Sequence, residues 1–174
     1  MISRKFIATS FHCTRRLGET LPCDLSDEKT VAVLGQQYVD EKLLHLYNTI
    51  PIVDVKYPEK AGFYVGNFDS HDFAIYILKY PAKFSRTIQP ICLPEPMEEF
   101  YGKDAVVAGW GRYTTPLFSN SQSKPLRSVK LKVDLKRYKH FNFFGTKLEK
   151  NKAGLIKDAC SGDSGLFSFR QILC

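Results

Sequence analysis

The chain has 174 residues, enough for one domain with a sizeable core, and 44% of them are apolar, which excludes a disordered protein. Lys and Arg number 25 against 18 Asp and Glu, so the net charge is +7 and polyanionic partners have to be considered. No apolar run approaches the length that crosses a bilayer, so we expect no membrane span.

Short apolar stretches separated by turns predict an all-β domain. The first stretch, from Met1 to Ala8, has an apolar run too short for a signal peptide, and we interpret it instead as a strand that leads into His12. A short helix is predicted within Val39–Asn48. Further strands are predicted over Val31–Gly35, Ile52–Pro58, Phe73–Leu78, Ala105–Ala108 and Val129–Lys136. Phe73–Leu78 is continuously apolar, which predicts a strand buried on both faces, whereas Val129–Lys136 alternates apolar and charged residues.

Four short motifs follow one another along the chain. They are Phe11-His12-Cys13, His71-Asp72-Phe73-Ala74, Ala108-Gly109-Trp110-Gly111 and Gly162-Asp163-Ser164-Gly165. Taken alone, His12 would be a core histidine, Asp72 a turn residue and the last motif an ordinary turn. Together and in this order the motifs resemble those of trypsin-like serine proteases, whose triad runs His, Asp, Ser in chain order.

The resemblance covers nearly all of the chain and implies a chymotrypsin-like double β-barrel. It implies one partial domain over residues 1–174, with a first barrel over about 1–80, a linker over about 81–100 and a partial second barrel over about 101–174. The expected fold is incomplete at the N-terminus and in the second barrel.

The resemblance also implies a catalytic triad. A serine hydroxyl needs a base to take its proton and a third group to hold that base in the right tautomer. Ser164 would be the nucleophile, His12 the general base and Asp72 the orienting carboxylate. The backbone N–H groups of Gly162 and Ser164 would form the oxyanion hole.

Two further carboxylates would have roles by the same resemblance. Asp158 would lie at the base of the specificity pocket and pair with substrate Arg or Lys. Asp163 would pair with an N-terminal amine released by zymogen cleavage, and Leu166 stands where the family usually has a glycine. Because no Ile-Val-Gly-Gly-like start is present, we expect residues 1–174 alone to show little peptidase activity.

The implied function is a secreted serine endopeptidase that hydrolyses protein or peptide substrates after Arg or Lys, without a metal or other cofactor. Two alternatives stay open. The chain could be an inactive homologue that acts as a binding or regulatory module. It could also bind polyanions through the segment Lys124–Lys152, which holds ten basic and two acidic residues. A solvated charged face explains such a segment equally simply, and we favour it.

The five cysteines are Cys13, Cys23, Cys92, Cys160 and Cys174, and an odd number leaves at least one unpaired within the chain. The resemblance implies partners outside this sequence for Cys13 and Cys160. It implies a bond from Cys92 to a light chain or propeptide.

Overall fold

The computed structural model describes residues 1–15, 22–25, 30–59, 61, 71–93, 95, 100–112, 123–134, 145–146, 149–150 and 156–157. The chain divides into two compact units, one containing Met1–Cys92 and the other beginning at Leu93. Among the described residues, the regular structure of the first unit consists of strands and short 3-10 helices, and that of the second unit consists of strands.

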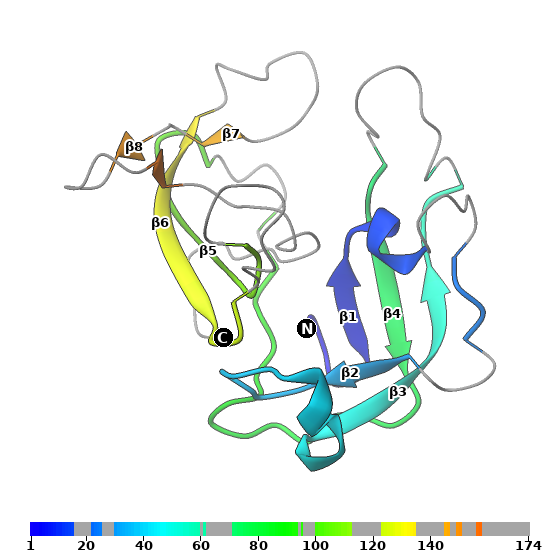
Figure 1. Cartoon of the computed structure of the whole chain (residues 1–174). Coiled ribbons are helices and arrows are strands. Elements are labelled where there is room, and N and C mark those ends of the chain that lie inside the picture. Colours follow the sequence, from blue (N-terminus) through cyan, green and yellow to red (C-terminus); the bar gives the residue numbers. More distant parts are fainter. Residues whose placement is uncertain are drawn as a thin grey trace. The chain divides into compact units, whose positions relative to one another are not determined.

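The first unit is built on a four-stranded antiparallel sheet. Its strands are β1 (Phe6–Thr9), β2 (Val31–Val33), β3 (Thr49–Lys56) and β4 (Ala74–Leu78). They lie in the order β1-β4-β3-β2, so that the last strand in sequence is inserted between the first and the third (Figure 1). β-Branched and aromatic residues dominate these strands, as expected for side chains that pack on a pleated surface.

Two apolar clusters stabilise this unit. The larger consists of buried residues from the sheet and from the segment after β4: Ala32, Ile50, Ile52, Leu78, Ala82 and Ile88. The smaller surrounds Phe11, which is 1% exposed and packs with Ala61, Ala74 and Val55. Because Phe11 directly precedes His12, the smaller cluster anchors the segment that carries the candidate site.

The predicted strands are found, with corrections to their bounds and burial. The strand expected over Met1–Ala8 is confined to Phe6–Thr9, since the Ile2 backbone N–H turns back to the Phe6 carbonyl at 2.9 Å. The expectation that Phe73–Leu78 is buried on both faces is wrong. Only Ala74 and Leu78 are buried in β4, and Phe73 is 44% exposed, because one face of the sheet covers the core and the other is partly open.

The predicted short helix is present as the 3-10 helix η2 (Glu41–Leu46). The Asp40 carboxylate caps its start by accepting a hydrogen bond from the Lys42 backbone N–H at 3.1 Å. This cap satisfies a donor that the first turn of a helix would otherwise leave free.

Gly35 follows β2 with φ +72, a conformation that side chains with a Cβ rarely adopt. A Cβ there would lie 2.9 Å from Ile88 Cγ1 in the larger cluster. We expect Gly35→Ala to lower the free energy of unfolding by about 2–3 kcal/mol, from backbone strain plus overpacking. Gly102 is the matched control, because its φ is +70 but a Cβ would meet nothing within 4 Å. Urea denaturation of both variants measures the difference, and equal losses would contradict the contact with Ile88.

The second unit contains a three-stranded sheet in the order β5-β6-β7, made of β5 (Asp104–Gly109), β6 (Arg127–Asp134) and β7 (Gly145–Thr146). A further pair joins β8 (Glu149–Lys150) to β9 (Ile156–Lys157). The alternation predicted for Val129–Lys136 is confirmed over its described part, since Leu131 and Val133 are buried and Lys130 and Lys132 are exposed.

In the basic segment Lys124–Lys152, two described lysines are paired with a carboxylate on a neighbouring strand. Lys130 Nζ and Lys132 Nζ lie 2.8 and 2.9 Å from the two oxygens of Asp104 on the neighbouring strand. Hydrogen bonds from these two lysines lower the pKa of Asp104 to about 2. One carboxylate therefore neutralises part of the charge of two lysines, which favours a solvated face. Polyanion binding by this segment stays a prediction.

The Asp104 pKa gives a prediction for acid conditions. A lowered folded pKa contributes stability above the unfolded value of 3.8, and this contribution is lost as the pH falls toward about 2. We expect Asp104→Asn to remove that part of the pH dependence, measured by unfolding between neutral and acid pH. The double variant Lys130→Gln/Lys132→Gln is the control, in which the pKa of Asp104, followed by NMR, should return to its ordinary value. An Asp104 pKa that does not rise in this variant would contradict the assignment.

Candidate active site

His12 and Asp72 are brought together by the register of two neighbouring strands. Thr9 at the end of β1 lies opposite Ala74 at the start of β4. His12 lies just beyond the end of β1, in the 3-10 helix η1 (Phe11–Thr14), and Asp72 lies just before β4. Two residues 60 positions apart in sequence thus meet at one edge of the sheet.

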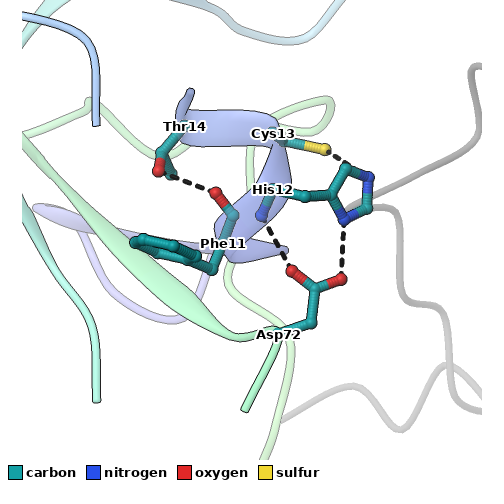
Figure 2. A network of polar contacts seen from close by, with 5 residues as sticks. All are labelled: Phe11, His12, Cys13, Thr14 and Asp72. Carbon is teal, nitrogen blue, oxygen red and sulfur yellow. Dashed lines mark hydrogen bonds and ion pairs between the residues drawn. The ribbon is translucent and has the colours of Figure 1, made fainter. Parts of the chain in front are cut away.

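The contact between them has two points (Figure 2). His12 Nδ1 lies 2.6 Å from Asp72 Oδ2, and the His12 backbone N–H donates to Asp72 Oδ1 at 2.8 Å. An ionised carboxylate only accepts hydrogen bonds, so the proton of the neutral imidazole lies on Nδ1. The Nε2 atom is then a proton acceptor, and the half-exposed ring (46%) leaves it accessible.

Phe11 and Thr14 hold η1 in place. The Phe11 ring packs against Tyr57 with a centroid separation of 4.7 Å, and the Arg15 guanidinium lies 4.9 Å above the same ring. The buried Thr14 hydroxyl donates to the Phe11 carbonyl at 2.7 Å and closes the turn. The backbone around His12 is therefore fixed by packing on one side and by Asp72 on the other.

Cys13 gives the ring a second neighbour. Its sulfur lies 3.5 Å from His12 Nε2, on the side of the imidazole opposite Asp72 (Figure 2). Burial raises the pKa of the Cys13 thiol, and the charge of Asp72 raises it further, so the thiol proton is retained near neutral pH. The Cys13 S–H therefore donates to Nε2.

Tyr76 is a site neighbour that the sequence reasoning missed. Its hydroxyl donates to the Cys13 carbonyl at 3.3 Å, which ties β4 to η1. Burial raises the pKa of Tyr76 to about 12, so this hydroxyl remains a donor throughout the neutral range. The available signal was a tyrosine inside the apolar strand β4, since the hydroxyl of a buried tyrosine usually finds a partner.

Among the predicted site residues, the structure describes only His12 and Asp72. Asp158, Gly162, Asp163 and Ser164 lie outside the described residues, so their predicted roles stay predictions. His71, next to Asp72 in the sequence, contributes its backbone carbonyl to a hydrogen bond from the Phe73 N–H at 2.7 Å.

The bonding of one cysteine, Cys92, differs from the expectation. Cys13 and Cys23 are free thiols. Cys92 is disulfide-bonded, and its partner lies outside the described residues. A bridge from Cys92 to a light chain or propeptide would have to replace this bond.

Within the described ranges, no group of three or more His, Cys, Asp or Glu side chains is arranged to hold a metal ion. The helices in these ranges are also too short or too polar to cross a membrane.

Comparisons with known proteins place these features in one family. The family model Trypsin matches residues 1–165. Melanization protease 1 of Drosophila melanogaster is 28% identical over 186 residues, which cover 95% of this chain and 44% of that protein. Inactive CLIP domain-containing serine protease A28 of Anopheles gambiae is 38% identical over 60 residues, which cover 34% of this chain and 16% of that protein. The chain spans less than half the length of the first four curated relatives it matches.

A solved structure shares the fold. Neuropsin, a serine protease of mouse brain, superposes with a TM-score of 0.70 and 17% identity, over 97% of this chain and 70% of that one. At this identity the likeness shows the chymotrypsin-like fold, which confirms the expected fold class. The match of the family model over most of the sequence shows, in addition, that the chain belongs to the trypsin family of serine proteases.

Proposed function

We propose that this protein is a serine endopeptidase in which His12 is the general base, Asp72 the orienting carboxylate and Ser164 the nucleophile. The single observation that carries the proposal is the two-point contact of Asp72 with the His12 ring and backbone, at 2.6 and 2.8 Å. A carboxylate on Nδ1 fixes the tautomer that leaves Nε2 able to take a proton.

In the proposed reaction, Nε2 of His12 accepts the Ser164 hydroxyl proton as the oxygen attacks the substrate carbonyl. Asp72 stabilises the imidazolium that forms, without itself taking the proton. The same nitrogen then gives the proton to the leaving amine, and water repeats the cycle on the acyl-enzyme. The side chain of Cys13 has to turn away from Nε2 for this to happen.

The substrate preference is proposed from the sequence. Asp158 would pair with Arg or Lys of the substrate, because an unpaired buried carboxylate rejects substrates that lack a cation. Gly162 and Ser164 would supply the oxyanion donors, and Asp163 the activation pair. Action outside the cell fits the disulfide at Cys92.

A serine-reactive phosphonate tests the proposal directly. A longer form of the protein, with an activated N-terminus that can pair with Asp163, is incubated with a biotinylated phosphonate that mimics an Arg substrate, and the labelled residue is identified by mass spectrometry. We expect label at Ser164, blocked by prior heat denaturation, with a matched phosphonate that mimics a Glu substrate as the specificity control. A folded protein that takes no label, or takes it elsewhere, would contradict the proposal.

The second candidate is an inactive homologue that binds a protein partner. Two observations favour it: the Cys13 thiol contacts Nε2 at 3.5 Å, and Leu166 replaces a usual glycine beside the nucleophile motif. One similar protein carries the word inactive in its own name. The same labelling experiment separates the two, because an inactive homologue stays folded yet unlabelled.

A further inference from the structure

The segment that precedes β1 and the segment that follows β4 lie side by side. The Leu78 N–H donates to the Lys5 carbonyl at 2.9 Å, and the Ala82 N–H donates to the Arg4 carbonyl at 2.7 Å. Both segments are rich in Lys and Arg. Positive charge from two distant parts of the sequence is therefore brought onto one surface.

Four exposed cations of these segments have no carboxylate partner among the residues that the structure describes. They form what we call the basic surface, which consists of Arg4, Lys5, Lys83 and Arg86. None of the ion pairs between described residues includes any of these four cations. The lysines of β6 differ, because Lys130 and Lys132 share the Asp104 carboxylate. No described carboxylate thus reduces the positive potential of the basic surface, which attracts negatively charged groups.

The basic surface also offers an apolar contact, and its groups are held in place. The Phe84 ring is 40% exposed, and the Arg4 guanidinium lies 4.9 Å from its centroid. Arg86 lies in a tight turn, Ser85–Ile88, which is closed by backbone hydrogen bonds at 2.9 and 3.4 Å. The buried Ile88 side chain anchors this turn in the larger cluster. Because these groups are already ordered, binding a ligand here would cost less conformational entropy.

We propose that the basic surface binds a segment of a partner protein that is acidic and also carries apolar side chains. The acidic residues of the partner would pair with the cations, and an apolar residue would pack on the Phe84 ring. Arg and aromatic residues are enriched at protein interfaces and among the residues that dominate their binding energy. The binding would weaken with salt, because exposed ion pairs are screened. It does not depend on catalysis by Ser164.

Fluorescence anisotropy tests the proposal on the longer form of the protein that is used for labelling. The probe is a fluorescein-labelled peptide, Glu-Glu-Leu-Phe-Glu-Glu, at an ionic strength of about 0.15 M. We expect Lys83→Gln/Arg86→Gln to weaken binding by about tenfold and Phe84→Ala to weaken it by a similar factor. Lys130→Gln/Lys132→Gln is the matched control, because it removes the same charge from lysines that Asp104 already neutralises. Its affinity should equal that of the wild type.

Each result either supports or overturns the proposal. Equal weakening in the two double variants would mean that net charge alone attracts the peptide. Absence of binding to the wild type, or equal binding of a peptide with Ser in place of Leu and Phe, would contradict an acidic and apolar ligand. Tighter binding of a sulphated oligosaccharide of equal charge would overturn the assignment to a protein partner. Circular dichroism verifies folding, and Lys83→Gln alone is the second variant should the double variant not fold.

Discussion

Replacing Asp72 with asparagine is expected to lower kcat by about 10⁴-fold with little change in KM, because the histidine would be held in the wrong tautomer. The structure gives a specific reason. One oxygen of Asp72 accepts the His12 backbone N–H at 2.8 Å. In the variant the single amide oxygen keeps this bond, which turns the amide NH₂ group toward Nδ1.

An NH₂ group facing Nδ1 can only donate to it. The imidazole then carries its proton on Nε2 and cannot accept one from Ser164. The fold should remain, since both the volume and one of the two hydrogen bonds are preserved. The loss would therefore appear in chemistry and not in substrate binding.

The measurement, on the same longer form of the protein, is hydrolysis of a fluorogenic Arg substrate, together with the rate of phosphonate labelling. Asp54→Asn is the matched control, because Asp54 is a half-exposed carboxylate that pairs with Lys56 at 2.7 Å. Its rates should equal those of the wild type. An Asp72→Asn variant with nearly full activity would remove His12 and Asp72 from the catalytic machinery.

Much of the fold follows from local sequence signals. The apolar, β-branched stretches around Val31, Ile52, Ala74 and Val106 form strands where expected, because such residues pack well on a pleated surface. The resemblance to trypsin-like proteases singled out His12 and Asp72. His12 and Asp72 then lie close together because Thr9 pairs with Ala74. In an antiparallel pair, the residues after β1 and the residues before β4 lie at the same end of the two strands.

The remaining features depend on contacts that no local pattern encodes. The Tyr76 hydroxyl reaches a carbonyl 63 positions away, and Asp104 meets two lysines through the register of β5 with β6. The turn of η1 brings the Cys13 thiol back to the His12 ring. The burial of β4 was overestimated because an apolar run does not reveal whether both faces of a sheet are covered.

Replacing Phe11 with alanine is expected to lower the free energy of unfolding by about 3–5 kcal/mol, among the largest losses for a single core substitution. Phe11 is 1% exposed and is the largest member of the smaller cluster. Its removal leaves a cavity beside Tyr57 and removes the cation–π contact between the Arg15 guanidinium and the Phe11 ring. A whole domain is stabilised by only about 5–15 kcal/mol, so the effect should be plain in urea denaturation.

Two further variants test whether the loss of stability comes from the burial of the Phe11 ring. Phe73→Ala removes a phenyl ring of the same size that is 44% exposed. This substitution should lower the free energy of unfolding by much less than Phe11→Ala does. Phe11→Leu keeps most of the apolar volume and should cost less than about 1.5 kcal/mol. It also serves as the measurable variant if Phe11→Ala does not fold.

The substitution at Phe11 also links packing to the candidate active site. The buried Phe11 ring holds η1 in place. A cavity left by this ring would therefore let the backbone of His12 move. His12 Nδ1 lies 2.6 Å from Asp72 Oδ2, and we expect the proton between these atoms to lose its low-field NMR resonance in Phe11→Ala and to keep it in Phe73→Ala. A resonance unchanged in Phe11→Ala would mean that Asp72 alone positions His12, through its bonds to the ring and to the backbone.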